Sequence, residues 1–96
     1  MIAIPQPARF PLGRLVATPG VLATLEHAGQ SASEFIERHL RGDWGEVDGD
    51  DWASNDQALE DGTRLVSAYL TKDNVKIRII TEWDRSYTTV MLAEEY

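Results

Sequence analysis

The chain has 96 residues, of which 43% are hydrophobic, and it contains no cysteine. This length suits one domain with one core, and the missing cysteines exclude disulfides and thiolate metal sites. The formal net charge is −7, which disfavours direct binding to nucleic acid because phosphates repel an acidic surface. No apolar run approaches the roughly 20 residues of a membrane span, so we expect a cytoplasmic protein with no membrane partner.

The first nine residues contain prolines at positions 5 and 7, which prevent helix formation and interrupt the hydrogen bonding of a strand. We therefore predict a flexible arm over residues 1–9 and a single domain over residues 10–96. Residues 12–17, which follow the arm, are a candidate for an additional strand of the sheet predicted below.

The helical part of the chain is predicted to begin at residue 18. Thr18 and Pro19 are typical of the cap and first turn of a helix, and Gly29 is typical of its end. Ser31 and Glu34 have the spacing of a capping box, in which each side chain satisfies a free backbone N–H at the start of a second helix.

The chain changes from helix to strand near residue 63. Before it, Asp48 is a candidate cap for a third helix that runs to Gly62. After it, three segments rich in β-branched and aromatic residues are separated by short turns: residues 63–71, 75–83 and 87–92. This order predicts an α+β domain, in which two or three N-terminal helices pack on a C-terminal antiparallel meander. The meander has three strands, or four if residues 12–17 join it.

The negative charge is concentrated in one segment, residues 43–61. This segment holds eight of the 16 acidic residues and none of the nine basic ones, so the rest of the chain is almost neutral. A concentrated acidic segment can attract a basic protein surface or imitate a polyanion. Tryptophan is typical of interfaces, and the candidate partner-binding residues are Asp43, Trp44, Glu46, Asp48, Asp50, Asp51, Trp52 and Asp56.

Each of these features also has a plainer interpretation. The carboxylates can form a solvated helix face, and we favour a core position for both tryptophans. An EF-hand loop counted from Asp48 places Ala53 at the glycine position and Leu59 at the last glutamate position, so the calcium pattern fails. His27 and His39 lie on adjacent predicted helices without a fitting carboxylate partner, and we predict no metal and no cofactor.

A second candidate site is the turn within residues 81–89. Glu82 and Asp84 could act as an acid–base pair, with Arg85 holding an anion. In the simpler interpretation, Arg85 pairs with a neighbouring carboxylate and the turn has no chemistry. The sequence contains no Walker loop, dinucleotide fingerprint or nucleophile elbow, so we expect no catalytic residues.

Three strings give the chain a resemblance to a known family: ATPGVLATLEHAG, FIERHLRGDWGEVDGDDWASND and IITEWDRSYTTVMLAEEY. They resemble a family of short, uncharacterised proteins carried on bacterial plasmids and integrated mobile elements, with the patterns RHxxGDWG and ITExDRSxTT. The matching positions are His39, Gly42, Asp43, Trp44, Gly45, Asn55, Thr81, Glu82, Asp84, Arg85, Ser86, Thr88, Thr89, Glu94, Glu95 and Tyr96. The resemblance implies a mobile-element setting and transfers no catalytic mechanism.

Small acidic proteins of such elements are often counter-defence factors. The resemblance therefore implies a non-enzymatic, anti-restriction or anti-CRISPR-like modulator that occupies the basic nucleic-acid-binding surface of a host protein. The expected partner is a protein with a basic surface, and the expected state is a monomer or small homo-oligomer. Two alternatives stay open: a protein–protein interaction or antitoxin-like accessory module, and a small enzyme centred on Glu82, Asp84 and Arg85.

Overall fold

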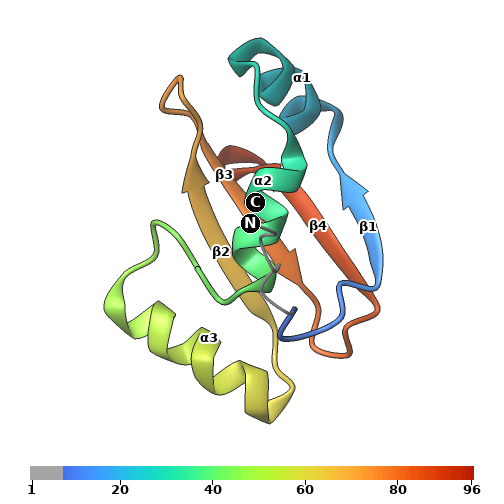
Figure 1. The fold of residues 1–96 in the computed structure, drawn as a ribbon, viewed down its shortest axis with the longest axis vertical. Coiled ribbons are helices and arrows are strands. Elements are labelled where there is room, and N and C mark those ends of the chain that lie inside the picture. The colour runs from blue at the N-terminus through green and yellow to red at the C-terminus, as the bar shows by residue number, and fades with distance from the viewer. Residues whose placement is uncertain (1–7) are drawn as a thin grey trace, which may run out of the picture.

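The computed structural model describes residues 8–96, which form three α-helices and a four-stranded sheet (Figure 1). The predicted α+β class, with the helices before the meander, is confirmed. Most of the predicted arm falls on residues 1–7, which lie outside the described residues. The elements are β1 (Arg14–Ala17), α1 (Pro19–Ala28), α2 (Ala32–Leu40), α3 (Gly49–Asp61), β2 (Leu65–Leu70), β3 (Lys76–Thr81), β4 (Tyr87–Leu92) and a 3-10 turn over Ala93–Glu95.

The sheet has the strand order β1-β4-β3-β2. Strands β2, β3 and β4 form the predicted antiparallel meander, and residues 14–17 supply the fourth strand. The expectation of a purely antiparallel sheet is wrong, because β1 pairs with β4 in parallel. The direction of β1 cannot be predicted from local sequence. A hairpin turn makes two neighbouring strands antiparallel, but three helices and two strands separate β1 from β4 in the chain.

The two faces of the meander differ in burial. Ile77 and Ile79 are fully buried on the face that α2 crosses in Figure 1, whereas Lys76 and Arg78 lie on the opposite face. The cross-strand partners of the two isoleucines continue the same buried layer. One core cluster joins this layer to α1 and α2: Val21, Leu25, Phe35, Ile36, Tyr69, Ile77, Ile79, Val90 and Leu92.

The predicted helix caps are confirmed at two of three helices. The Thr18 hydroxyl accepts a hydrogen bond from the Val21 N–H, and the Asp48 carboxylate accepts one from the Asp51 N–H. The capping box predicted at Ser31 is wrong, because its hydroxyl pairs with the hydroxyl of Ser33, two residues further on.

The outer edge of β2 is covered by the chain itself. The Ala68 N–H donates to the Trp44 carbonyl, and the Ala68 carbonyl accepts from the Glu46 N–H. Gly45, between them, has a φ of 75°, and a Cβ atom there would collide with the Ala68 carbonyl oxygen. This close approach removes free backbone groups from the middle of the edge.

Candidate interaction surface

Helix α3 is anchored to the sheet by a small part of its surface. The Asn55 amide donates to the Val66 carbonyl at 2.7 Å and its oxygen accepts from the Val66 N–H at 3.1 Å. Asn55 thus acts as a one-residue strand partner for the β2 edge. Asn55 and Ala58 are the buried residues of α3, and the remaining length of the helix lies beside the sheet at the lower left of Figure 1.

The exposed side of α3 is acidic. At 3.6 residues per turn, Glu60 falls opposite the buried pair, and Asp50, Asp56 and Asp61 fall on the two flanks of the helix. All four are exposed, as are the acidic residues at the start of the helix. We call the following set the acidic face: Glu46, Asp48, Asp50, Asp51, Asp56, Glu60 and Asp61.

The carboxylates of the acidic face are not neutralised within the described part of the chain. Among residues 8–96, the ion pair joins Arg38 to Asp43, outside this set, with 2.7 Å between Nε and Oδ2. The helix itself carries no basic residue. Its charge is therefore available to a cation in solution or on a partner.

The charge at the end of α3 opposes the helix. Asp50 and Asp51 in the first turn are favourable, because the N-terminus of a helix is its positive end. Glu60 and Asp61 stand at the negative end, where a carboxylate costs about 0.3–1 kcal/mol. Helix stability alone therefore does not explain their presence.

Trp44 belongs to the core. It is 0% exposed, its ring stacks against Phe10, and its Nε1 donates to the Asp56 carboxylate at 2.9 Å. The core position that we favoured is thus confirmed for this tryptophan, which no partner can touch on the folded surface. Trp52 differs: it is 36% exposed and lies beside the acidic face.

Asp43 has a structural role near the same place. The hydrogen bond from Arg38 holds the pKa of Asp43 below its usual value, and the other carboxylate oxygen accepts from the Gly45 N–H. Its carbonyl accepts a hydrogen bond from the Tyr69 hydroxyl. Asp43 therefore fixes the segment that covers the β2 edge, and its carboxylate is already engaged.

The second candidate site does not form a single cluster. Asp84 accepts hydrogen bonds from the N–H and the hydroxyl of Ser86, which closes the turn and lowers the pKa of Asp84. Arg85 donates to the carbonyls of Thr63, Glu82 and Ala58. The expected carboxylate partner of Arg85 is thus replaced by backbone carbonyls, one of which lies in the last turn of α3.

Glu82 faces a different environment. It lines a groove of about 290 Å³ on the open face of the sheet. In that groove Tyr96 accepts a hydrogen bond from Arg64 at 2.6 Å, and the Arg64 and Arg78 guanidinium groups lie over its ring. Glu82, Asp84 and Arg85 therefore point to three different sets of neighbours.

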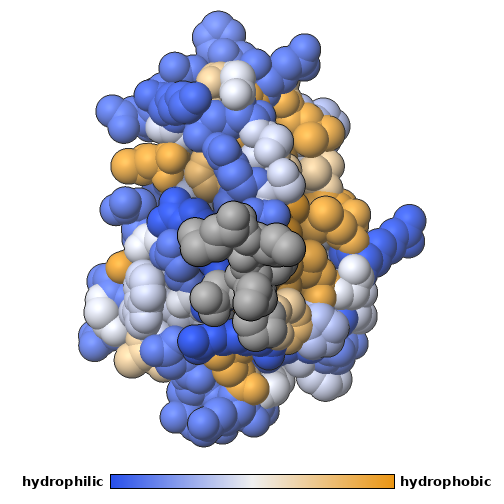
Figure 2. Space-filling view, viewed as in Figure 1, coloured by the Kyte–Doolittle hydropathy of each residue, from blue (hydrophilic) through white to orange (hydrophobic). Residues whose placement is uncertain are grey.

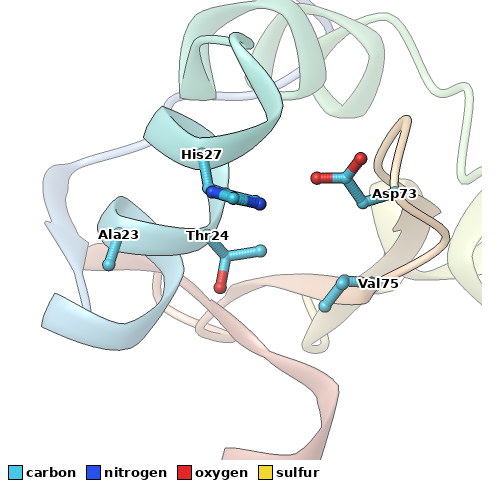
Figure 3. Close-up of a pocket in the computed structure, with 5 residues that line it drawn as sticks. All are labelled: Ala23, Thr24, His27, Asp73 and Val75. Carbon is cyan, nitrogen blue, oxygen red and sulfur yellow. The ribbon is translucent and has the colours of Figure 1, made fainter.

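A further hollow of about 350 Å³ lies between α1 and the β2–β3 turn (Figure 3). The His27 ring and the Asp73 carboxylate face each other across it, whereas the Thr24 hydroxyl points away from the imidazole. This geometry does not join a hydroxyl, a base and an acid in one line. Among residues 8–96, no group of three or more His, Asp or Glu side chains is placed to hold a metal ion.

The other histidine organises a buried polar chain that local sequence patterns did not reveal. His39 Nδ1 lies 2.5 Å from the Ser67 hydroxyl, and His39 Nε2 lies 2.9 Å from the Thr81 hydroxyl. Thr81 contacts Thr88 at 2.7 Å, and Thr88 donates to the Leu12 carbonyl. All four side chains are 0% exposed.

The last acceptor sets the direction of every bond in this chain. The Leu12 carbonyl can only accept, so the one proton of Thr88 is used there and Thr88 must accept from Thr81. Thr81 in turn accepts from Nε2 of His39, and Nδ1 accepts from Ser67. A neutral imidazole protonated on Nε2 satisfies the whole network.

Burial keeps this imidazole neutral. Desolvation, with a smaller contribution from the Arg85 charge, lowers the pKa of His39 from 6.5 to about 3. Although histidine and serine in contact are typical of a nucleophile and its base, solvent and substrate cannot reach this pair on the folded surface. The network connects α2 to β2, β3, β4 and the segment before β1.

No family model matches the chain, and neither a curated protein nor a solved structure matches it. No helix within residues 8–96 has the length and apolar character needed to cross a bilayer.

Proposed function

We propose that the protein is a non-enzymatic binding protein whose acidic face occupies a basic, nucleic-acid-binding surface of a host protein. The observation that carries the proposal is the exposed charge of α3, whose carboxylates form no ion pair within residues 8–96. Asp50 and Asp61 are about 16 Å apart along the helix axis at 1.5 Å per residue. The five carboxylates in that length are separated by four intervals that average about 4 Å along the axis, compared with 3.4 Å in one DNA strand.

The cost of this arrangement supports the same function. Glu60 and Asp61 destabilise the helix end on which they stand, and Arg85 bonds to the Ala58 carbonyl there without pairing with either carboxylate. Charges that oppose the fold are more readily explained by binding than by stability. Trp52, partly exposed beside them, adds an apolar contact.

The test is a charge reversal with a matched control. We expect D50K/D51K/E60K to abolish capture of the host partner, because the reversed charges repel a basic surface. All three residues are exposed. The control, E26K/E37K/D73K, changes the net charge equally at exposed sites outside the acidic face and should retain capture.

Capture is measured with the immobilised chain in host lysate, at low and high salt and with duplex DNA as a competitor. Release of a DNA-binding protein by salt, by DNA and by the triple reversal is the expected result. Capture that survives the triple reversal would contradict the proposal. Salt-resistant capture of another protein would favour the accessory-module alternative.

A further inference from the structure

The two edges of the sheet differ in what covers them. The β2 edge is closed by residues 44–46 and by Asn55. The other edge is β1, which borders the molecule on the right in Figure 1. Figure 2 shows apolar side chains gathered along that same side. Leu15 and Val16 of β1 are 50% and 41% exposed, and Leu22 on the following helix is 51% exposed.

The hydrogen bonds to β4 determine which backbone groups of β1 point outward. The Arg14 N–H donates to the Ser86 carbonyl, and the Thr18 N–H donates to the Val90 carbonyl. Backbone direction alternates along a strand, so Val16 also points to β4 while Leu15 and Ala17 point away from it. The N–H and carbonyl groups of Leu15 and Ala17 are thus directed to an edge that no other strand of residues 8–96 covers.

We propose that β1 pairs with β1 of a second copy of the chain, antiparallel, across a two-fold axis at Val16. In this register Leu15 of each copy exchanges two hydrogen bonds with Ala17 of the other. Val16 faces Val16 of the second copy as a non-hydrogen-bonded pair, the closer of the two pair types. The two sheets then form one eight-stranded sheet.

The pattern of the strand favours a second copy as the occupant. Arg14, the charged residue of β1, faces Thr18 in this register, so no like charges meet. Leu15 lies on the helix-covered side of the sheet, since its β4 partner Thr88 is buried there. Leu15 of each copy therefore contacts Ala17 of the other, so the same apolar pair occurs twice, as a two-fold interface requires.

The net charge of −7 does not oppose this association. Helix α3 sits at β2, the edge farthest from β1. At about 4.8 Å per strand, the two β2 strands of the dimer are about 34 Å apart, several times the Debye length of about 8 Å at physiological salt. The contact between four-residue strands is small, so we expect micromolar association.

Cysteine substitutions test this register cleanly, because the chain contains no cysteine of its own. V16C should form an intermolecular disulfide at least tenfold faster than L70C under the same oxidant, since only Val16 faces itself across the axis. Leu70 is the matched control, at 43% exposure on the opposite edge strand. Equal rates of cross-linking for the two variants would overturn the proposal.

Sedimentation of the cysteine-free protein gives a second readout. The wild type and V16T should show a concentration-dependent rise to twice the chain mass, whereas V16K should keep the mass of one chain because two lysines meet at the axis. Circular dichroism verifies that V16K is folded. A wild type that keeps the mass of one chain at all concentrations would overturn the proposal. If that single chain also binds an added strand peptide, the β1 edge binds a different partner.

Discussion

At the scale of single residues, the strings that carry the family resemblance are largely explained by packing. His39, Thr81 and Thr88 build the buried polar chain, and Trp44 fills the space beside it. Arg85 ties the β3–β4 turn to the end of α3. These positions serve the fold. The second string also contains exposed residues of the acidic face, namely Glu46, Asp48, Asp50, Asp51 and Asp56.

Burial of His39 predicts acid sensitivity. Its pKa is about 3 in the folded protein and 6.5 in the unfolded chain, so below pH 6.5 the unfolded state binds the extra proton. Stability is therefore full above pH 6.5 and falls as the pH is lowered towards 3, by up to about 1.4 kcal/mol per pH unit. Urea unfolding between pH 4.5 and 6.5, roughly where carboxylates contribute little, measures this slope.

Substitution separates the two histidines. H39N should lower stability at neutral pH, since it disturbs the network, and it should remove the slope. H27Q, at an exposed site, should leave the slope unchanged. A wild type whose free energy of unfolding is constant across this range would contradict the assignment of a buried, neutral His39.

Sequence patterns could not identify the hydrogen-bond partners of His39. Ser67 and Thr81 are 28 and 42 positions away along the chain. The sequence around Ser67 or Thr81 does not indicate a hydrogen bond to His39, because serine and threonine occur in both strands and turns. Only the strand register, which brings Thr81 opposite Thr88, places these hydroxyls together.

At the scale of elements, α3 combines a predictable start with an unpredicted attachment. Asp48 and Gly62 mark its ends in the sequence and in the structure. The two hydrogen bonds between Asn55 and Val66 could not be predicted, since they depend on where the helix meets the sheet. The parallel direction of β1 was missed for a related reason, because its partner β4 is distant in sequence.

The charge pattern of α3 predicts opposite effects at its two ends. E60Q/D61N removes two carboxylates from the negative end of the helix and should stabilise the protein by about 1 kcal/mol. D50N/D51N removes two from the positive end and should destabilise it by a similar amount. The free energy of unfolding at low salt gives both values.

Binding should respond differently from stability. Each double variant removes the same charge from the acidic face, so both should weaken partner capture. A pair of variants whose binding follows their stability, with E60Q/D61N binding better than the wild type, would contradict a role for charge in recognition. High salt should reduce both effects.

At the scale of the whole molecule, the sheet separates two surfaces of different character. The acidic face lies at β2, and the apolar edge lies at β1. Figure 2 shows the same division, with hydrophilic residues over α3 and apolar residues on the opposite side. Self-association and partner binding can therefore occur together, with one acidic face at each end of a dimer.

This separation predicts different salt dependences for the two associations. Between about 0.05 M and about 0.5 M NaCl, partner capture should be lost because it depends on screened charge. The dimer constant should change by no more than a few fold, because apolar and backbone contacts form it. Sedimentation across this range decides the geometry. If salt strengthens the dimer, the two acidic faces lie close together. If salt dissociates it, an acidic face contacts the arginines of the second copy.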